Sequence, residues 1–114
     1  MNKSVRITFS EEAKNTLIYI QSKSFNKKEK MLYNAINNKL ELVKIDIHYG
    51  NPIAQNLIPM EYKQKYHVDA LFRIELPMFW RMLYTLKNNN EIEIIAFVLD
   101  IIDHKKYNNK FNYK

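Results

Sequence analysis

Residues 92–102 read IEIIAFVLDII, the most continuously apolar stretch of the chain. The stretch is too short to span a bilayer, which takes about 20 apolar residues. It is rich in isoleucine and valine, and a strand that is apolar on both sides is typical of the centre of a sheet with both faces covered. We therefore expect a central strand here, buried on both faces.

Three other segments predict strands. Residues 3–9 alternate polar and apolar side chains, and so do residues 70–76, while residues 79–86 carry the aromatic residues that suit a strand. Pro77 and Met78 lie between the second and third of these and predict a tight connection. The asparagines of KNNNE, residues 87–91, supply a turn before the central strand because Asn tolerates positive φ.

Two helices are predicted between the first strand and the others. Ser10 precedes two glutamates, which is the pattern of a capped helix start. Asn26 is the expected cap of the second helix, whose apolar stripe holds Leu32, Ala35, Ile36, Leu40 and Val43, with Lys39 among them. Gly50 and Pro52 end this helix or lie in the loop after it. Residues 51–69 predict a loop with one helical turn at 59–66.

These elements predict an α+β fold with the order β-α-α-β-β-β. The N-terminal helical hairpin packs on one face of a small, twisted, mostly antiparallel sheet, which makes two layers. The chain has 114 residues, so we expect one domain over residues 1–114.

The chain is basic, with a net charge of +6 and a pI near 9.4. A basic surface favours nucleic acid, an anionic membrane or an acidic protein as partner, and the alternative is a solvated lysine-rich surface. Lys27, Lys28 and Lys30 stand at a predicted helix start, where they oppose the helix dipole. They suggest a contact with RNA or an acidic partner, with a solvated face as the alternative.

The chain contains no cysteine, which excludes disulfides and thiolate metal sites and fits a reducing cytoplasm. The N-terminus carries charges inside its apolar patch and does not read as a signal peptide, so we expect a cytoplasmic protein without a membrane partner. His48, His67 and His104 are too scattered to predict a metal site. No cofactor is expected.

Four motifs in the second half of the chain resemble those of a known protein family. LFRIEL, FWRMLYTL, EIEIIAFVL and DHKKY follow one another as a basic strand, an aromatic-Arg-Tyr strand, a hydrophobic strand and a terminal His, Lys and Tyr cluster. This order resembles the RelE/ParE superfamily, the small basic toxins of type II toxin–antitoxin systems. WRMLY is the best single match.

The resemblance implies one of three functions. RelE-like members cut messenger RNA in the ribosomal A site without metal, ParE-like members lack the nuclease residues and poison DNA gyrase, and others have lost activity. We expect a RelE-like, ribosome-dependent mRNA endonuclease that inhibits translation. The alternatives are a gyrase inhibitor and a degenerate interaction module. The expected partners are mRNA, the ribosome and a cognate antitoxin.

The resemblance places phosphate-binding arginines at Arg81 and Arg73. Alternation puts Arg81 on one side of its strand with Phe79 and Leu83, where it either reaches the sheet edge or faces a ligand. Glu75 stands where RNase members carry a second basic residue. It forms a salt bridge with Arg73 or acts as a general base.

His104 is the expected acid or base, because its ordinary pKa suits proton transfer. Tyr107 is the fourth candidate catalytic residue, and its alternative is packing on the sheet. Lys105 stands where many members carry arginine after the histidine. The remaining candidates for nucleic-acid contact are Lys106, Lys110 and Tyr113.

Overall fold

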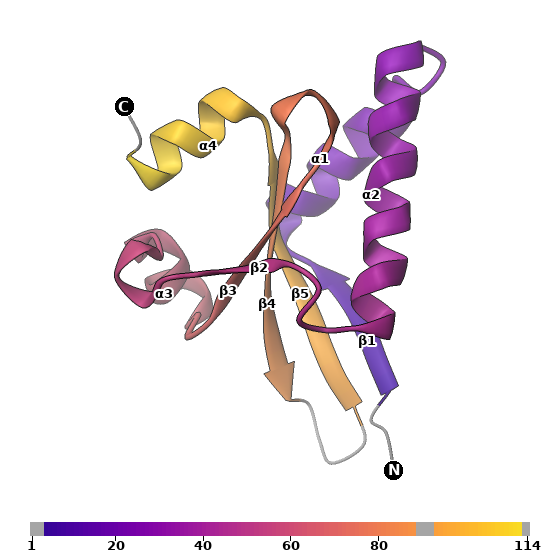
Figure 1. The fold of residues 1–114 in the computed structure, drawn as a ribbon. Helices are drawn as coiled ribbons and strands as arrows, with labels where there is room; N and C mark the ends of the chain where they lie inside the picture. The colour runs from indigo at the N-terminus through magenta and orange to yellow at the C-terminus, as the bar shows by residue number, and fades with distance from the viewer. Residues whose placement is uncertain (1–3, 89–92, 113–114) are drawn as a thin grey trace.

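The computed structural model describes residues 4–88 and 93–112, which form an α+β fold around a five-stranded mixed sheet (Figure 1). The six predicted elements are all present, and the described residues form five more. In chain order the structure has β1 (Ser4–Phe9), α1 (Glu11–Ser22), α2 (Lys27–Ile45), β2 (Asn51–Ile53), the short 3-10 helix η1 (Gln55–Leu57), α3 (Met60–Tyr66), β3 (Leu71–Glu75), the 3-10 helix η2 (Pro77–Phe79), β4 (Arg81–Asn88), β5 (Glu93–Ile102) and α4 (His104–Phe111).

The strands lie in the order β1-β5-β4-β3-β2. β1 runs parallel to β5, and the pairs β5–β4, β4–β3 and β3–β2 are antiparallel. The predicted central strand is confirmed, because β5 lies between β1 and β4. Its neighbouring residues Val98 and Leu99 are both 1 % exposed and belong to cores on opposite faces of the sheet.

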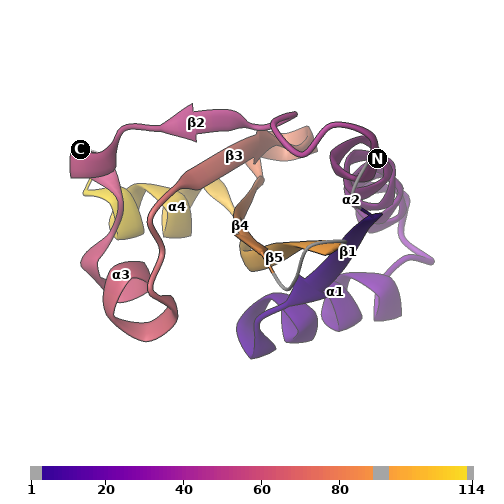
Figure 2. The ribbon, with the colours of Figure 1, turned by 90° about the horizontal axis from the view of Figure 1, so that it is seen from below.

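Helices cover both faces of the sheet, so the prediction of two layers is wrong. α1 and α2 pack on one face, and α3 and α4 gather on the other (Figures 1 and 2). The first core contains Leu32, Ile36, Val43, Met82 and Tyr84. The second core contains Tyr62, Leu83, Leu99, Tyr107 and Phe111.

The second helical layer comes from short segments with weak sequence signals. α3 has seven residues and buries Tyr62, and α4 has eight residues and buries Tyr107 and Phe111. The helical turn predicted at 59–66 is confirmed as α3. The polar tail after Ile102 folds into α4, because its two aromatic side chains, four residues apart, reach the sheet from one side of the helix.

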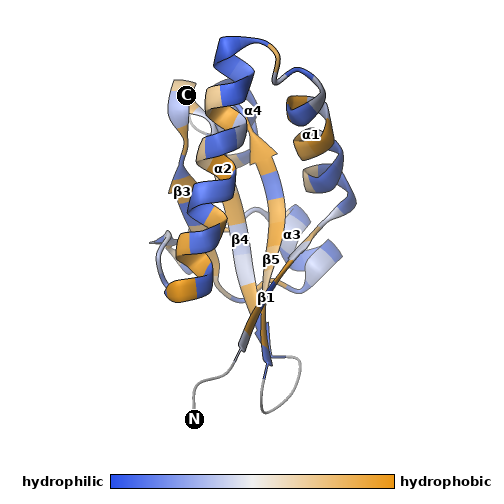
Figure 3. Cartoon of the chain, turned by 90° about the vertical axis from the view of Figure 1, so that its right-hand side faces the viewer, coloured by the Kyte–Doolittle hydropathy of each residue, from blue (hydrophilic) through white to orange (hydrophobic). Residues whose placement is uncertain are grey.

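The helical hairpin follows the prediction closely. Ser10 caps α1, where its Oγ accepts a hydrogen bond from Ala13 N at 3.0 Å and donates one to Leu99 O at 2.6 Å. Asn26 precedes α2 as expected but makes no side-chain cap hydrogen bond. Figure 3 shows many polar residues on the side of α2 toward the viewer, and behind it β5, which is largely apolar, beside β4, which is apolar in part. No helix in the described ranges is long and apolar enough to cross a membrane.

The connection between β3 and β4 is longer than predicted. The strand expected from residue 79 begins at Arg81, because η2 occupies residues 77–79. Met78 and Phe79 have φ of 60° and 61°, a left-handed conformation that non-glycine residues rarely adopt. This turn leaves Phe79 70 % exposed at the end of the sheet, beside the start of β4.

Candidate functional site

The start of β4 and the end of β3 bring the two predicted arginines together. Arg81 pairs across the strands with Glu75, and Arg73 lies two residues before Glu75, so the three side chains share one face of the sheet. This is the face that α3 and α4 cover. The alternation predicted for this strand is confirmed, since Leu83 lies in the core of this face and Met82 in the core of the other.

Glu75 bridges the two guanidinium groups. Its Oε1 lies 3.1 Å from Arg73 Nε and its Oε2 lies 2.9 Å from Arg81 Nε. The salt bridge predicted with Arg73 is therefore confirmed, and Arg81 is a second partner that the sequence did not predict. Two cations share one carboxylate, so this trio keeps one unbalanced positive charge. The Glu75 side chain is 52 % exposed, against 29 % for Arg73 and 13 % for Arg81.

Tyr107 of α4 packs beneath the two arginines. The guanidinium carbons of Arg81 and Arg73 lie 5.1 and 5.8 Å from its ring centroid, within cation–π range. Its hydroxyl accepts a hydrogen bond from Arg73 Nη1 at 2.9 Å. The ring is buried and stacks on Phe111 at 4.5 Å. Tyr107 therefore packs on the sheet and positions the arginines, and its ring is not open to a nucleic-acid base.

His104 lies at the rim of this group. It is the first residue of α4, whose start is capped by Asp103 through a 2.9 Å hydrogen bond from Lys106 N. The exposed imidazole contacts Asn108 through Nε2 at 3.1 Å and lies 5.7 Å from the Phe79 ring. The Phe79 carbonyl in turn accepts a hydrogen bond from Arg81 Nη1 at 2.5 Å. Phe79 thus contacts His104 through its ring and Arg81 through its carbonyl.

The predicted lysines fall into two groups. Lys105 and Lys106 are exposed on the first turn of α4, near His104. Lys110 is committed to two ion pairs, with Asp100 at 2.9 Å and with Glu61 at 3.2 Å. We therefore leave Lys110 out of the candidate site. The prediction for Tyr113 lies outside the described residues.

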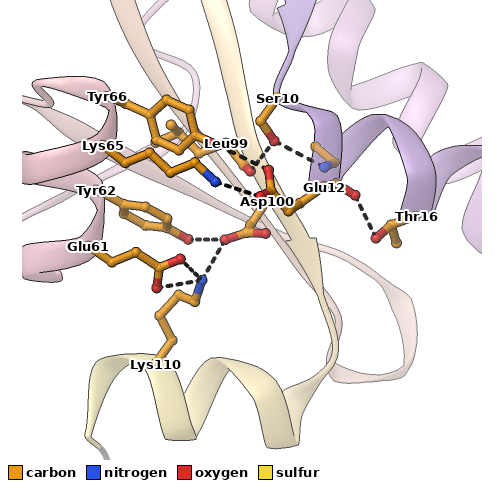
Figure 4. A network of polar contacts seen from close by, with 11 residues as sticks. Ser10, Glu12, Thr16, Glu61, Tyr62, Lys65, Tyr66, Leu99, Asp100 and Lys110 are labelled. Carbon is orange, nitrogen blue, oxygen red and sulfur yellow. Dashed lines mark hydrogen bonds and ion pairs between the residues drawn. The ribbon is translucent and has the colours of Figure 1, made fainter.

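Sequence reasoning missed a polar network behind the site (Figure 4). Leu83 pairs with Asp100 and Tyr84 with Val98, so β5 carries an extra residue at this point. The bulge lets Asp100, which is 8 % exposed, face α3 and α4. There it accepts hydrogen bonds from Tyr62 Oη at 2.5 Å and from Lys110 Nζ at 2.9 Å. An acid inside an apolar strand was the available signal.

Burial and charge shift the pKa values in this network. Burial raises the pKa of Tyr62, and the neighbouring Asp100 carboxylate raises it further. Burial works to lower the pKa of Lys110, but the hydrogen bond and charge of Asp100, with those of Glu61, raise it overall. Tyr62 therefore stays protonated and Lys110 stays charged. Together they fix α3 and α4 to the strand that ends beside His104.

A second, more exposed cluster joins α1 to α3. Glu12 accepts hydrogen bonds from Lys65 Nζ at 2.7 Å and from Tyr66 Oη at 3.0 Å (Figure 4). The hydrogen bond from Lys65 is the largest cause that lowers the pKa of Glu12 to about 2. This contact stabilises the junction of the two helical layers and lies apart from the arginines.

Within the described residues, no group of three or more His, Asp or Glu side chains is placed to hold a metal ion. Comparisons with protein-family models, with curated proteins and with solved structures find no match. The functional argument therefore depends on the residues of the site itself.

Proposed function

We propose that this protein is a RelE-like toxin that cleaves messenger RNA on the ribosome. The observation that carries the proposal is the convergence of Arg73 and Arg81 on one carboxylate and one tyrosine ring. Two guanidinium groups held side by side match the oxygens of a phosphodiester.

The proposed chemistry is attack of a ribose 2′-hydroxyl on the adjacent phosphate, which forms a 2′,3′-cyclic phosphate and breaks the bond from phosphorus to the 5′-oxygen of the next nucleotide. A base takes the proton of the 2′-hydroxyl, and an acid protonates the leaving 5′-oxygen. Arg81 and Arg73 bind the phosphoryl oxygens and stabilise the charge that grows on them. The scissile phosphate replaces the Glu75 carboxylate, whose half-exposed side chain turns outward into solvent. Tyr107 is a positioning residue for both arginines.

His104 is the proposed acid or base, and Lys105 adds charge beside the RNA. The histidine is exposed at the rim and is therefore open to a bound strand. The ribosome supplies the orientation of the RNA, which by itself is worth several orders of magnitude in rate. His104 makes no contact with the arginines that the structure describes, and this fits a reaction in which the ribosome brings the RNA and the histidine together.

One observation favours a second candidate, a gyrase-binding protein without hydrolytic chemistry. Glu75 already pairs with both arginines, and an acid at this position is a departure from the basic residues that the resemblance implies for nucleases. In that case the arginine pair and its surroundings form a binding surface for a protein. The two candidates share a basic site that an antitoxin with an acidic segment is expected to cover.

A reconstituted translation system separates the two candidates. The protein is added, the 5′ ends of the messenger are mapped, and supercoiling by purified gyrase is measured in parallel. Wild-type protein is expected to produce new messenger ends, and Arg81→Ala and His104→Ala to lose them. Arg6→Ala is the matched control, because Arg6 is also an ion-paired arginine but lies on β1, where it pairs with Glu93 of β5. Intact messenger together with blocked supercoiling decides for the gyrase candidate.

A further inference from the structure

The last turn of α1 and the turn that follows it present two aromatic rings to solvent among lysines. Phe25 is 80 % exposed and Tyr19 is 61 % exposed. We call these two residues, together with Lys23, Lys27, Lys28 and Lys30, the hairpin tip. Single exposed apolar side chains are common on protein surfaces, but two exposed aromatic rings close to four cations form a mixed patch that fits a binding partner.

The turn that carries Phe25 has an ordered backbone. Ser24 N donates to Gln21 O at 3.1 Å, and Asn26 N donates to Lys23 O at 2.9 Å. Lys23 Nζ lies 5.9 Å from the centroid of the Tyr19 ring. The Phe25 side chain therefore projects from a fixed backbone, and it is available to a partner without a large loss of chain entropy.

Three lysines of the hairpin tip do not stabilise α2, the helix to which they belong. Lys27, Lys28 and Lys30 lie in the first turns of α2, where positive charge opposes the helix dipole. All three are exposed and none has an ion-pair partner among the described residues. Their charge is thus free to meet an anionic partner.

The hairpin tip lies at the same end of the molecule as the arginine site. In Figure 1 the α1–α2 turn, the β3–β4 connection and the start of α4 all lie toward the top. Cations therefore recur along this end, from the hairpin tip to Arg81 and Lys105. A long, flexible polyanion with flat bases fits such a surface, because its phosphates meet the lysines and its bases stack on the rings.

We propose that the hairpin tip is a second contact for single-stranded RNA, in which Phe25 and Tyr19 stack on bases and the lysines bind phosphates. This contact goes beyond the proposed cleavage, since it needs neither His104 nor the arginine pair. It holds RNA by a sequence-tolerant mechanism.

The test measures binding of a short fluorescent oligouridine to the full chain by anisotropy, without ribosomes. Phe25→Ser and Tyr19→Ser are each expected to weaken binding about tenfold, the usual effect of losing one stacked base. Ile45→Ser is the matched control, because Ile45 is 82 % exposed at the opposite end of α2. It is expected to bind RNA like the wild type.

The lysines are tested by the salt dependence of the same binding. Replacing Lys27, Lys28 and Lys30 by Gln is expected to reduce the slope of log affinity against log salt by about 2, at roughly 0.7 per lost phosphate contact. A triple Gln variant at Lys14, Lys44 and Lys63 makes the same change in net charge elsewhere. Its slope is expected to stay closer to that of the wild type.

The proposal is overturned if Phe25→Ser leaves RNA binding unchanged, or if Ile45→Ser weakens it equally. It is also overturned if Phe25→Ser weakens binding to polyglutamate or to vesicles of anionic phospholipid but does not weaken binding to RNA. Messenger cleavage is scored separately. Loss of cleavage in Arg81→Ala, with the Phe25→Ser effect on oligouridine binding still present in that background, keeps the two proposals distinguishable.

Discussion

Arg81 Nε lies 2.9 Å from Glu75 Oε2, and the two residues are direct cross-strand partners on β4 and β3. A carboxylate in this position occupies the place that a phosphate would take between Arg81 and Arg73. Because the Glu75 side chain is half exposed, its ion pairs add little to stability and open readily. Glu75 therefore acts as an internal competitor for anions in the proposed site.

Removing this competitor is expected to strengthen RNA binding. Glu75→Gln keeps the shape of the side chain but frees the charge of both arginines, and the affinity for oligouridine should rise by up to about fivefold, since a half-exposed ion pair that the phosphate no longer has to break is worth up to about 1 kcal/mol. Fluorescence anisotropy measures the change. Glu41→Gln, which removes an acid paired with Lys44 on α2, is the control.

The same variant tests the alternative role of Glu75. Stronger binding with unchanged or faster cleavage supports the competitor role. Stronger binding with lost cleavage identifies Glu75 as the general base. Unchanged or weaker binding contradicts the proposed anion site.

Tyr107 is expected to act by holding Arg73. Tyr107→Phe keeps the buried ring and removes the hydroxyl that accepts the 2.9 Å hydrogen bond, which should cost about 1 kcal/mol in the free energy of unfolding. Tyr107→Ala should cost about 3–5 kcal/mol, because it leaves a cavity under the arginines. Urea unfolding measures both changes.

Tyr33→Phe is the control for the lost hydroxyl, because Tyr33 is half-buried on α2. Its stability should stay near that of the wild type. A Tyr107→Phe variant that loses no more stability than this control would show that the hydrogen bond to Arg73 contributes nothing.

Gly50 allows the loop after α2 to pack against the sheet. Its N–H donates to Tyr84 Oη at 3.0 Å, and an added Cβ would lie 2.9 Å from Tyr84 Cε1. Gly50→Ala should therefore destabilise the fold by about 1–3 kcal/mol, the usual cost of overpacking. Thermal unfolding beside Asn51→Ala, an exposed neighbour, checks this. Equal stability of the two variants would mean that the ring moves aside freely.

The contact between Glu12 and Lys65 predicts a pH dependence. The pKa of Glu12 falls from its ordinary 4.5 to about 2 in the folded protein, with the hydrogen bond from Lys65 as the largest cause. A lowered carboxyl pKa stabilises the fold above the unfolded value and loses this contribution as the pH falls through the folded value. The stability difference between wild type and Glu12→Gln should thus be full near neutrality and shrink between about pH 4.5 and pH 2.

Glu11→Gln is the control for this titration, because Glu11 precedes Glu12 in the same helical turn. Denaturant unfolding at a series of pH values, at low salt, gives both differences. A Glu12→Gln difference that stays constant over this range would contradict the pKa shift.

Local patterns predicted the elements that form the first core. The alternation in β1 and β3, the cap at Ser10 and the stripe that includes Leu32 and Leu40 all depend on near neighbours in the chain. The pattern also placed Arg81 and Leu83 on one side of their strand. Periodicity and caps are local properties, so sequence was sufficient for them.

Long-range pairing explains what the sequence did not predict. The Arg81 contact with Glu75 follows from the β3–β4 register, and the place of Tyr107 follows from the docking of α4. Asp100 turns toward α3 because of a bulge, and the acid itself inside an apolar strand is the one local sign of it. Short polar segments such as α3 and α4 become helices through one or two buried aromatics, which is a tertiary effect.

The most direct test of the arginine site is the rate of messenger cleavage on programmed ribosomes at saturating protein. Arg81→Ala should lower this rate by about 100-fold or more, the usual effect of removing a donor to developing charge. Arg81→Lys should restore only part of it, because lysine lacks the forked geometry. Arg6→Ala should cleave like the wild type. Equal cleavage by Arg81→Ala and Arg6→Ala would contradict the account.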